Sequence, residues 1–477
     1  MEFALIAVPL FVAAVAALVP SNRMRPWLLP IASIAHLALT ALLLIHPEWT
    51  AGSPWLKLDP LGRIILPMVS LLFLICSFYA VGVLHYRHAQ VNRVFCVCLT
   101  SFLSVMSLVV LSQHLGLMWV AIETATLVTA PLIYFNHTPQ SIEATWKYLL
   151  IGSVGIALAL LGTFFLAYSS LHQGIEPTLA LDDLLRNAPK LSKSWLHAAF
   201  VLLLVGYGTK MGLAPMHTWK PDAYGEAPGV VGAIFAGGLT SCAFLALLRV
   251  YHICDAAGEG EYISRLLLLM GFLSMTVAGL FMVGQRDFKR MLAYSSVEHM
   301  GILAIGLGIG GPALFGTLLH VVTNGLTKGV LFLSAGNIHR AYASKSINQV
   351  NGAMRRLPLS GSLFLAGFLA ITGSPPFGPF ISEFSILNGA FEAGRFVTGG
   401  FFLLLLLIVF IGMGSTVLQV VQGRASTTVH FTPYREDILT IMPVIILMAC
   451  VLILGLYIPS TLTDALNDAV HFLKARP

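Results

Sequence analysis

Long apolar runs separated by short polar loops fill most of the chain. The runs lack the strict alternation of a transmembrane β-strand, and about 20 apolar residues suffice for a helix to cross a bilayer. By that measure the pattern predicts an all-α polytopic membrane protein with about fourteen transmembrane helices, and no long amphipathic helix after them. The expected spans lie near residues 3–20, 27–45, 62–84, 94–112, 115–135, 148–170, 197–217, 228–251, 264–284, 291–310, 312–337, 359–389, 398–422 and 438–458.

Two of these spans, the seventh and the twelfth, are interrupted. Span seven breaks at Leu213-Ala214-Pro215, and span twelve breaks at the Pro/Gly-rich segment 373–379. Proline does not continue a helix, and freed backbone is tolerated at membrane depth only inside protein or along a water-filled cavity. Breaks at matching places in two halves indicate internal repeats. We therefore predict N-terminal helices 1–3 in residues 1–92, a five-helix repeat (helices 4–8) in 93–258, an inverted five-helix repeat (helices 9–13) in 259–422, and a C-terminal helix in 423–477.

The composition excludes a soluble protein, because 57% of the residues are hydrophobic and only 10% are charged, against about 25% charged residues in soluble domains. There is no basic arm, so we expect no nucleic-acid partner. Most basic residues fall on odd-numbered loops, which the positive-inside rule makes cytoplasmic, so both termini are expected on the outer side. The loop at 171–195 is the main opposing evidence. The basic residues on the odd-numbered loops are Arg23, Arg25, Arg87, Arg93, Lys147, Lys220, Arg286, Lys289, Arg290, Arg340, Lys345, Arg355, Arg356, Arg424 and Arg435.

Charged residues inside the spans are the candidates for function. A charge at membrane depth is costly and usually faces a bundle interior or a water-filled cavity. Lys210 lies in span seven beside the break, and Glu123 lies in span five. We expect Glu123 to be the anionic partner of Lys210 in a proton relay. A purely structural ion pair, or a neutral glutamic acid, is the alternative. His217 follows the break, where it either caps the broken helix or belongs to a proton path.

A second group of polar residues lies in spans ten to twelve. His320, Asn324 and Lys328 recur at i, i+4 and i+8, and so form one polar stripe about 12 Å long. His299 lies in span ten, and Glu383 follows the break in span twelve. Three polar residues in register on an apolar helix are hard to explain by packing alone, so we predict that this group also carries ions.

Motifs for other chemistry are absent from the sequence. There is no P-loop and no dinucleotide-binding glycine pattern, and Cys96-Val97-Cys98 has the wrong spacing for a zinc or iron–sulfur site. We therefore expect no cofactor, no metal and no catalytic residue. Any energy input must come from partner subunits or from an ion gradient.

One segment resembles a known family. The stretch KMGLAPMHTWKPDAYGEA, Lys210 to Ala227, is similar to the antiporter-like subunits of respiratory complex I, Mrp-type cation/proton antiporters and membrane-bound hydrogenases. The similarity extends over about residues 60 to 390 and favours the hydrogenase-4 component F branch. Supporting stretches are AIETATL (121–127), EATWKYLL (143–150), GSVGIALALLGT (152–163), RDFKRMLAYSSVEHMG (286–301), GLGIGGP (306–312) and SPPFGPFISEF (374–384).

The resemblance implies roles for single residues. Glu123 and Lys210 match a glutamate and its lysine partner, Lys328 matches a central lysine, and Glu383 stands near the exit. His320 matches a histidine of the same stripe. There are two departures from the family pattern. Span eight has no lysine, and Asn324 stands where many relatives have a histidine. Since asparagine cannot change charge, we hypothesise that His299 compensates for it.

The resemblance also implies a function. The protein is expected to be a non-catalytic, proton-translocating membrane subunit. The parent complex would be a group 4 [NiFe] hydrogenase of hydrogenase-4 or formate hydrogenlyase type, or a complex I-like NADH/quinone oxidoreductase. The partners of the subunit would be other membrane subunits and a peripheral hydrogenase or dehydrogenase arm. It would lie in the bacterial cytoplasmic membrane with both termini periplasmic, and would move protons, with Na⁺ as the alternative. A subunit of a Mrp-type antiporter without a redox arm, and a scaffold that does not pump, are the other hypotheses.

Overall fold

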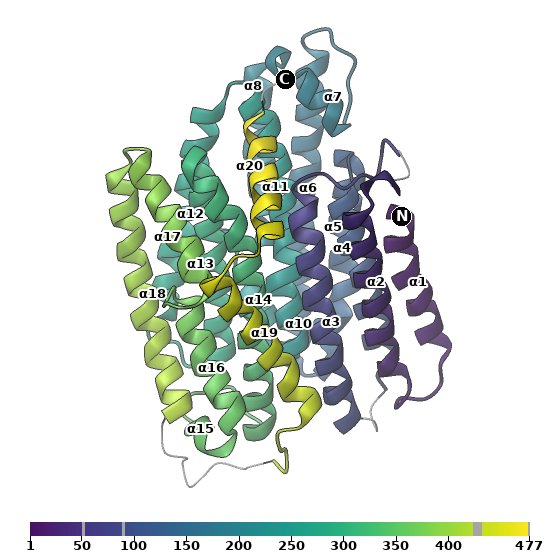
Figure 1. Cartoon of the computed structure of the whole chain (residues 1–477), viewed down its shortest axis with the longest axis vertical. Coiled ribbons are helices and arrows are strands. Elements are labelled where there is room, and N and C mark those ends of the chain that lie inside the picture. The colour runs from purple at the N-terminus through teal and green to yellow at the C-terminus, as the bar shows by residue number, and fades with distance from the viewer. Residues whose placement is uncertain (50–52, 88–90, 423–431, 476–477) are drawn as a thin grey trace.

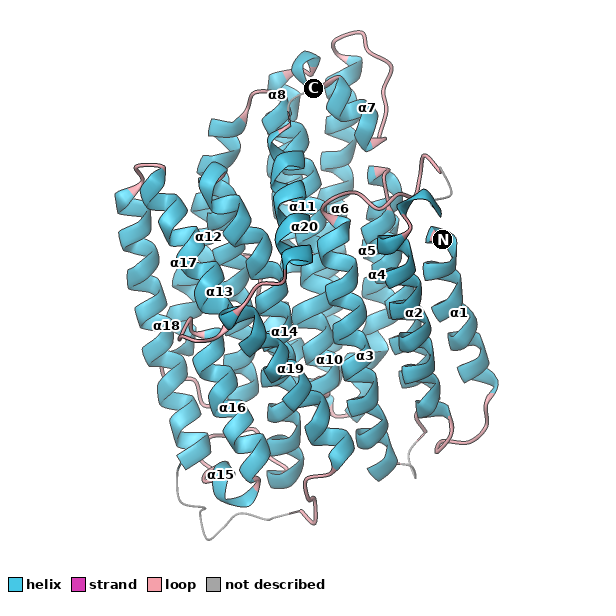
Figure 2. Ribbon diagram, in the orientation of Figure 1, coloured by secondary structure: helices cyan, strands magenta, loops and turns pink. Residues whose placement is uncertain are grey.

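Almost every apolar run of the sequence is a helix in the computed structural model, which describes residues 1–49, 53–87, 91–422 and 432–475. The helices lie roughly side by side in one bundle, and the described residues contain only isolated β-bridges (Figures 1 and 2). Eleven of these helices are long and apolar enough to cross a membrane, and shorter apolar helices lie at Glu2–Leu18 and Pro358–Ile371. The expected all-α polytopic membrane fold is confirmed.

Each predicted span has a helix, or a broken pair of helices, at its place in the chain. The helices are α1 (Glu2–Leu18), α2 (Leu28–Ile45), α3 (Gly62–Tyr86), α4 (Arg93–Leu111), α5 (Leu115–Ile133), α6 (Pro139–Leu171), α7 (Leu181–Arg186), α8 (Lys193–Met211), α9 (Trp219–Glu226), α10 (Gly229–Ile234), α11 (Thr240–Ala256), α12 (Gly260–Met282), α13 (Phe288–Ile309), α14 (Leu314–Tyr342), α15 (Ala353–Arg356), α16 (Pro358–Ile371), α17 (Gly378–Glu392), α18 (Phe396–Gln422), α19 (Ile438–Leu456) and α20 (Ser460–Lys474).

Inner and outer helices differ in how much of their surface is covered. The most apolar windows of the segment 229–256, which contains α10 and α11, and of the segment 311–342, which contains α14, are 100% buried. The windows of α2, α6, α12 and α19 are only 39% buried. A helix that is apolar on all sides belongs inside a bundle or in lipid. The polar residues of α14 therefore lie at the centre of the molecule, where they must find protein partners.

The two interruptions lie where the sequence placed them. α8 ends at Met211 and α9 begins at Trp219, whereas α16 ends at Ile371 and α17 begins at Gly378. Both linkers contain a cis peptide bond before proline, Ala214–Pro215 and Pro375–Pro376. Each break falls in the fourth helix of one proposed five-helix repeat. The division of the chain into those repeats stays a prediction.

A third irregularity was not expected. Between α10 and α11 the chain forms a π-helical turn, Phe235–Leu239, which contains Gly237 and Gly238. A Cβ at Gly237 would lie 2.9 Å from the carbonyl oxygen of Gly325 on α14. The glycine therefore lets α14 approach the backbone closely at this turn.

The end of the chain corrects one expectation. α20 is an amphipathic helix of 15 residues that buries Leu466, Ala469 and Leu473. Its apolar residues are spaced for one helical face rather than for a membrane span, which is why a search for long apolar runs missed it. The start of α1 and the end of α20 lie in the same half of the bundle (Figure 1). Which side of a membrane that half faces stays a prediction, and Arg424 lies outside the described residues.

Candidate functional site

The first candidate pair is formed across α5 and α8. Lys210 lies on the last turns of α8 and is fully buried. Its Nζ donates a hydrogen bond to Thr126 on α5 and lies 3.7 Å from Glu123 Oε2. Glu123 Oε1 accepts a hydrogen bond of 3.0 Å from Ser153 on α6, but Oε2 has no hydrogen-bond partner. The expected contact between Lys210 and Glu123 is therefore present, as a loosely held ion pair.

The break after α8 is stabilised by the residues that follow it. Gly212 has a left-handed backbone, with φ +81°, and ends the helix. Carbonyl groups in the last turn of a helix have no partner within it. Here Trp219 Nε1 donates to the carbonyl oxygen of Thr209 at 2.8 Å, and Lys220 Nζ donates to that of Met211 at 2.5 Å. Side chains of α9 thus satisfy the backbone that the proline break leaves free.

The second candidate cluster joins α13, α14 and α17, and all its members are buried. Lys328 Nζ donates to Ser295 Oγ at 2.6 Å. His299 Nδ1 lies 3.0 Å from His320 Nε2, so that one ring donates to the other. The second nitrogen of His320, Nδ1, is 2.9 Å from Ser382 Oγ. Groups from three helices therefore form a chain of hydrogen bonds that begins at His299 and ends on α17.

Carboxyl groups lie on both sides of His299. Glu383 Oε1 is 4.0 Å from His299 Nδ1, and Glu298 Oε2 is 3.7 Å from His299 Nε2. Within the described ranges, these two oxygens, His299 Nε2 and Asn324 Oδ1 are buried without a hydrogen-bond partner. Unsatisfied buried polar atoms are rare in proteins and need an explanation such as bound water. Bound water between α13, α14 and α17 would satisfy these atoms.

The fold and this constellation can be compared with known proteins. The family model described as NADH:quinone oxidoreductase/Mrp antiporter, TM, matches residues 112–412. The chain is 36% identical to a hydrogenase-4 component F homolog of Methylacidiphilum infernorum over 377 residues. The aligned region covers 77% of each of the two chains.

This chain belongs to the NADH:quinone oxidoreductase/Mrp antiporter family.

Solved structures agree with that membership. A chain of respiratory complex I from Thermus thermophilus matches with a TM-score of 0.77 at 27% identity, over 96% of this chain and 97% of that chain. A chain of the Mrp complex from Dietzia sp. DQ12-45-1b matches with a TM-score of 0.86 at 19% identity, over 99% and 98% of the two chains. The protein is thus an antiporter-like membrane subunit, as the sequence resemblance implied.

Two residues of this antiporter-like subunit were misjudged or passed over in the sequence. We expected Lys220 on a cytoplasmic loop, but it lies on α9 and is fully buried. The polar and aromatic stretch around it, with His217 and Trp219, is typical of a loop. Only the fold shows that α9 packs into the interior of the bundle. Glu298 was not selected as a site residue, although its position next to His299 in the sequence was a usable signal.

His217 lies on the linker between α8 and α9, with 7% of its surface exposed. Its Nδ1 has no hydrogen-bond partner, and its ring lies 6.3 Å from that of Tyr294. Among the residues that the structure describes, no side-chain hydrogen bond or ion pair joins it to another candidate residue. Both interpretations of His217, as a cap or as part of a path, therefore remain predictions.

The donor set of the second cluster is also one that could hold a cation. His299, His320 and Glu383 each offer a ligand atom, and these atoms all lie within 4.8 Å of one another. Two imidazoles and a carboxylate suit a divalent transition metal. The two rings are, however, already hydrogen-bonded to each other and to Ser382. Both nitrogens of His320 therefore already have hydrogen-bond partners within the protein.

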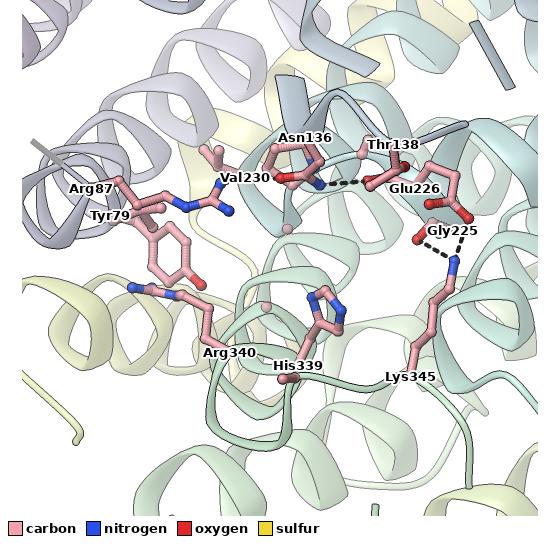
Figure 3. Close-up of a pocket in the computed structure, with 16 residues that line it drawn as sticks. Tyr79, Arg87, Asn136, Thr138, Gly225, Glu226, Val230, His339, Arg340 and Lys345 are labelled. Carbon is pink, nitrogen blue, oxygen red and sulfur yellow. Dashed lines mark hydrogen bonds and ion pairs between the residues drawn. The ribbon is translucent and has the colours of Figure 1, made fainter. Parts of the chain in front are cut away.

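A cavity of about 420 Å³ opens near the ends of α3, α9 and α14 (Figure 3). Arg87, His339 and Arg340 line it, and Lys345 donates hydrogen bonds to Glu226 and to the carbonyl oxygen of Gly225. None of the candidate residues from the sequence lines this cavity. It is a basic recess at the end of the bundle, and neither Lys210 nor Lys328 lines it.

Proposed function

We propose that this chain is the proton-translocating membrane subunit of a group 4 [NiFe] hydrogenase complex of hydrogenase-4 or formate hydrogenlyase type, or of a complex I-like NADH/quinone oxidoreductase. The observation that carries the proposal is the buried Lys210 beside a helix break, with Glu123 only 3.7 Å away. The 36% identity to a hydrogenase-4 component F homolog supports the assignment to this kind of complex.

The Glu123–Lys210 pair would act as the switch. An ion pair about 4 Å apart is worth roughly 4 kcal/mol at an effective dielectric near 20. Moving one charge through a membrane potential costs about 2.3 kcal/mol per 100 mV. The two energies are comparable, so opening the pair could release one proton from Lys210. Apart from Lys210, Ser153 is the one side-chain partner of the Glu123 carboxylate among the described residues, so little else holds that carboxylate in place.

The second cluster would receive the proton. Lys328 lies near both Glu298 and Glu383, and the bonded pair His299–His320 lies beside them. An imidazole can accept a proton on one nitrogen and release one from the other. Asn324 cannot do so, and its Oδ1 is unpaired. The contact between His299 and His320 supports the hypothesis that His299 supplies the proton-transfer group that the asparagine lacks.

The proposal includes the setting of the protein. The subunit would lie in the bacterial cytoplasmic membrane with its termini on the periplasmic side. It would bind other membrane subunits and a peripheral hydrogenase or dehydrogenase arm, whose redox chemistry opens and closes the Glu123–Lys210 pair. The chain itself would carry no cofactor.

The test uses sealed vesicles that contain the native complex, with proton uptake and redox turnover recorded together. Lys210→Met should abolish uptake, because it removes the proton carrier but keeps an unbranched side chain in its place. Retained turnover would show that chemistry and transport can be uncoupled. Uptake and turnover both unchanged would contradict the proposal and favour a scaffold. Ion exchange driven by a Na⁺ gradient, with no redox turnover, would instead identify a Mrp-type antiporter.

A further inference from the structure

A gap separates the two lysines of the proposed path. Lys210 is held by α5, whereas Lys328 is held by Ser295 on α13. Within the described part of the chain, no hydrogen bond or ion pair links the two groups. A proton that leaves Lys210 therefore needs a carrier between α8 and α13.

Lys220 lies at that junction. Its Nζ donates to the carbonyl oxygen of Met211, the residue after Lys210, at 2.5 Å. The same nitrogen also contacts the carbonyl oxygen of Ser296, the residue after Ser295, at 3.3 Å. The side-chain nitrogen of Lys220 thus contacts the end of α8, which carries Lys210, and also α13, whose Ser295 accepts the hydrogen bond of Lys328.

The charge of Lys220 is not neutralised by a nearby carboxylate. The side chain is fully buried, and no carboxylate of the described residues lies within 4.0 Å of its Nζ. Lys328 is close enough for the two cations to repel each other. A buried charge without a partner is costly, whereas a neutral amine is not. The surroundings therefore favour a lysine that holds its extra proton only briefly.

Two hydroxyl groups, those of Tyr224 and Ser296, belong to residues that contact Lys220. The Tyr224 ring centroid lies 5.6 Å from Lys220 Nζ. The hydroxyl groups of Tyr224 and Ser296 lie near each other, yet neither makes a hydrogen bond of ordinary geometry. Buried hydroxyls of this kind are usually satisfied by water. The neighbourhood of Lys220 thus offers groups through which a proton can pass.

We propose that Lys220 carries the proton between Lys210 and Lys328. One N–H bond breaks on the Lys210 ammonium and one forms on the neutral Lys220 amine, so that the positive charge crosses from α8 to α9. The same exchange then moves it to Lys328, and Lys220 returns to the neutral form. This inference rests on the proposed function, since it names the link within that path.

The competing explanation is that Lys220 only caps α8. A cation at a helix C-terminus stabilises the helix through its dipole and its free carbonyls. Lys289 is a matched control for that role. It is also buried, and its Nζ donates to two backbone carbonyls, those of Gly225 at 2.9 Å and Ala227 at 2.7 Å. It caps backbone in the same way, but among the described residues its side chain makes no hydrogen bond or ion pair with α8 or with the cluster around Lys328.

The experiment compares Lys220→Met, Lys220→Arg and Lys289→Met in the native complex, with proton uptake, redox turnover and thermal unfolding measured together. Lys220→Met should slow uptake about a hundredfold, the lower end of what a positioned proton-transfer group contributes. Lys220→Arg keeps the charge and the donors but does not release its proton. It should therefore lower the unfolding temperature, because its permanent charge is buried without a carboxylate partner, and the complexes that remain folded should fail to pump. Lys289→Met should pump normally per folded complex.

Wild-type uptake in Lys220→Arg would overturn the inference. The Lys220→Arg result tests the inference by itself, even if Lys220→Met does not fold. An equal loss of uptake in Lys289→Met would also overturn it, because the effect would then be structural. If Lys210→Met abolishes uptake while both Lys220 variants pump, only this inference fails. If Lys210→Met pumps as well, the proposed function fails with it.

Discussion

Two ion pairs in this bundle, Asp59–Arg249 and Glu123–Lys210, differ in how many further hydrogen bonds their charged groups make. Arg249 on α11 contacts Asp59 at 3.0 Å, and its remaining nitrogens donate to the carbonyl oxygens of Val109 and Val110. Asp59 also accepts a hydrogen bond from the Gly62 amide at 2.7 Å. In the other pair, Lys210 and Glu123 are 3.7 Å apart.

The difference lies in how far each charge is satisfied. The side chains of Arg249 and Asp59 are 2% and 6% exposed, and both make several hydrogen bonds. Glu123 is 23% exposed and leaves Oε2 without a hydrogen-bond partner. A fully bonded pair has no cheap alternative arrangement and therefore holds α11 to the loop before α3. A pair with spare bonding capacity can open, which is what a switch requires.

The largest effect should come from breaking the saturated pair. Arg249→Met leaves Asp59 buried without its partner, and removing one member of a buried pair costs about 3–5 kcal/mol. We expect a large drop in the unfolding temperature of the purified complex. The complexes that remain folded should pump a normal number of protons per turnover.

The control is the double variant Asp59→Asn/Arg249→Met. Because the double variant removes both buried charges, no unpaired charge remains in the interior. It should therefore be more stable than Arg249→Met by itself. If Arg249→Met unfolded like the wild type but lost pumping, the assignment of this pair to structure rather than transport would be wrong.

A smaller effect should come from disturbing the loose pair without removing it. Gly152 on α6 faces Lys210, and a Cβ at that position would lie 2.7 Å from Lys210 Nζ. Because the ammonium ends a flexible side chain, Gly152→Ala should displace it rather than unfold the helix. Alanine is also the better helix former. We expect uptake about tenfold slower, equivalent to about 1.4 kcal/mol in the barrier, with unchanged thermal unfolding.

Gly155→Ala is the matched control on the same helix. There the added Cβ would meet Thr209 Cβ at 2.5 Å, which is held close to the backbone and cannot move aside cheaply. This variant should lower stability more than Gly152→Ala and affect transport less per folded complex. The reverse outcome would mean that the position of Lys210 Nζ does not control uptake.

The contrast between the two pairs also marks what the sequence could predict. The breaks, the helix positions and the pairing of Glu123 with Lys210 follow from local features: proline clusters, apolar runs and rare charges at membrane depth. Asp59 and Arg249 were not selected at all, because their importance comes from carbonyl groups on a different helix. A sequence shows that a charge is present, but not whether its hydrogen bonds are complete.

The second cluster illustrates the same limit. The stripe of His320 and Lys328 is readable from helical spacing, and His299 was suspected because Asn324 cannot titrate. The 3.0 Å contact of His299 with His320 joins two helices, so no spacing rule could reveal it. Lys220 was misjudged for a related reason, since a polar stretch after a break looks the same whether it turns toward solvent or toward the core.

A third ion pair should give the smallest effect, because its cation, Lys193, is 70% exposed to solvent. Glu259, between α11 and α12, accepts hydrogen bonds from Lys193 at 2.8 Å and His197 at 2.6 Å. The bond from Lys193, followed by that from His197, lowers the pKa of the Glu259 carboxyl below its ordinary value. An ion pair whose cation is solvated in this way contributes at most about 1 kcal/mol.

The sign of that shift fixes a pH dependence. A carboxyl whose pKa is lowered by folding stabilises the fold above its unfolded pKa, about 4.3 for glutamate, and that contribution is lost as the pH falls through the lower, folded value. Glu259→Gln should therefore unfold at a slightly lower temperature than the wild type at pH 7. The two proteins should converge as the pH falls through the lowered pKa of the Glu259 carboxyl. A difference that persists in acid would show that Glu259 acts through packing or a neutral hydrogen bond. It would then resemble the saturated Asp59–Arg249 pair more than a solvated one.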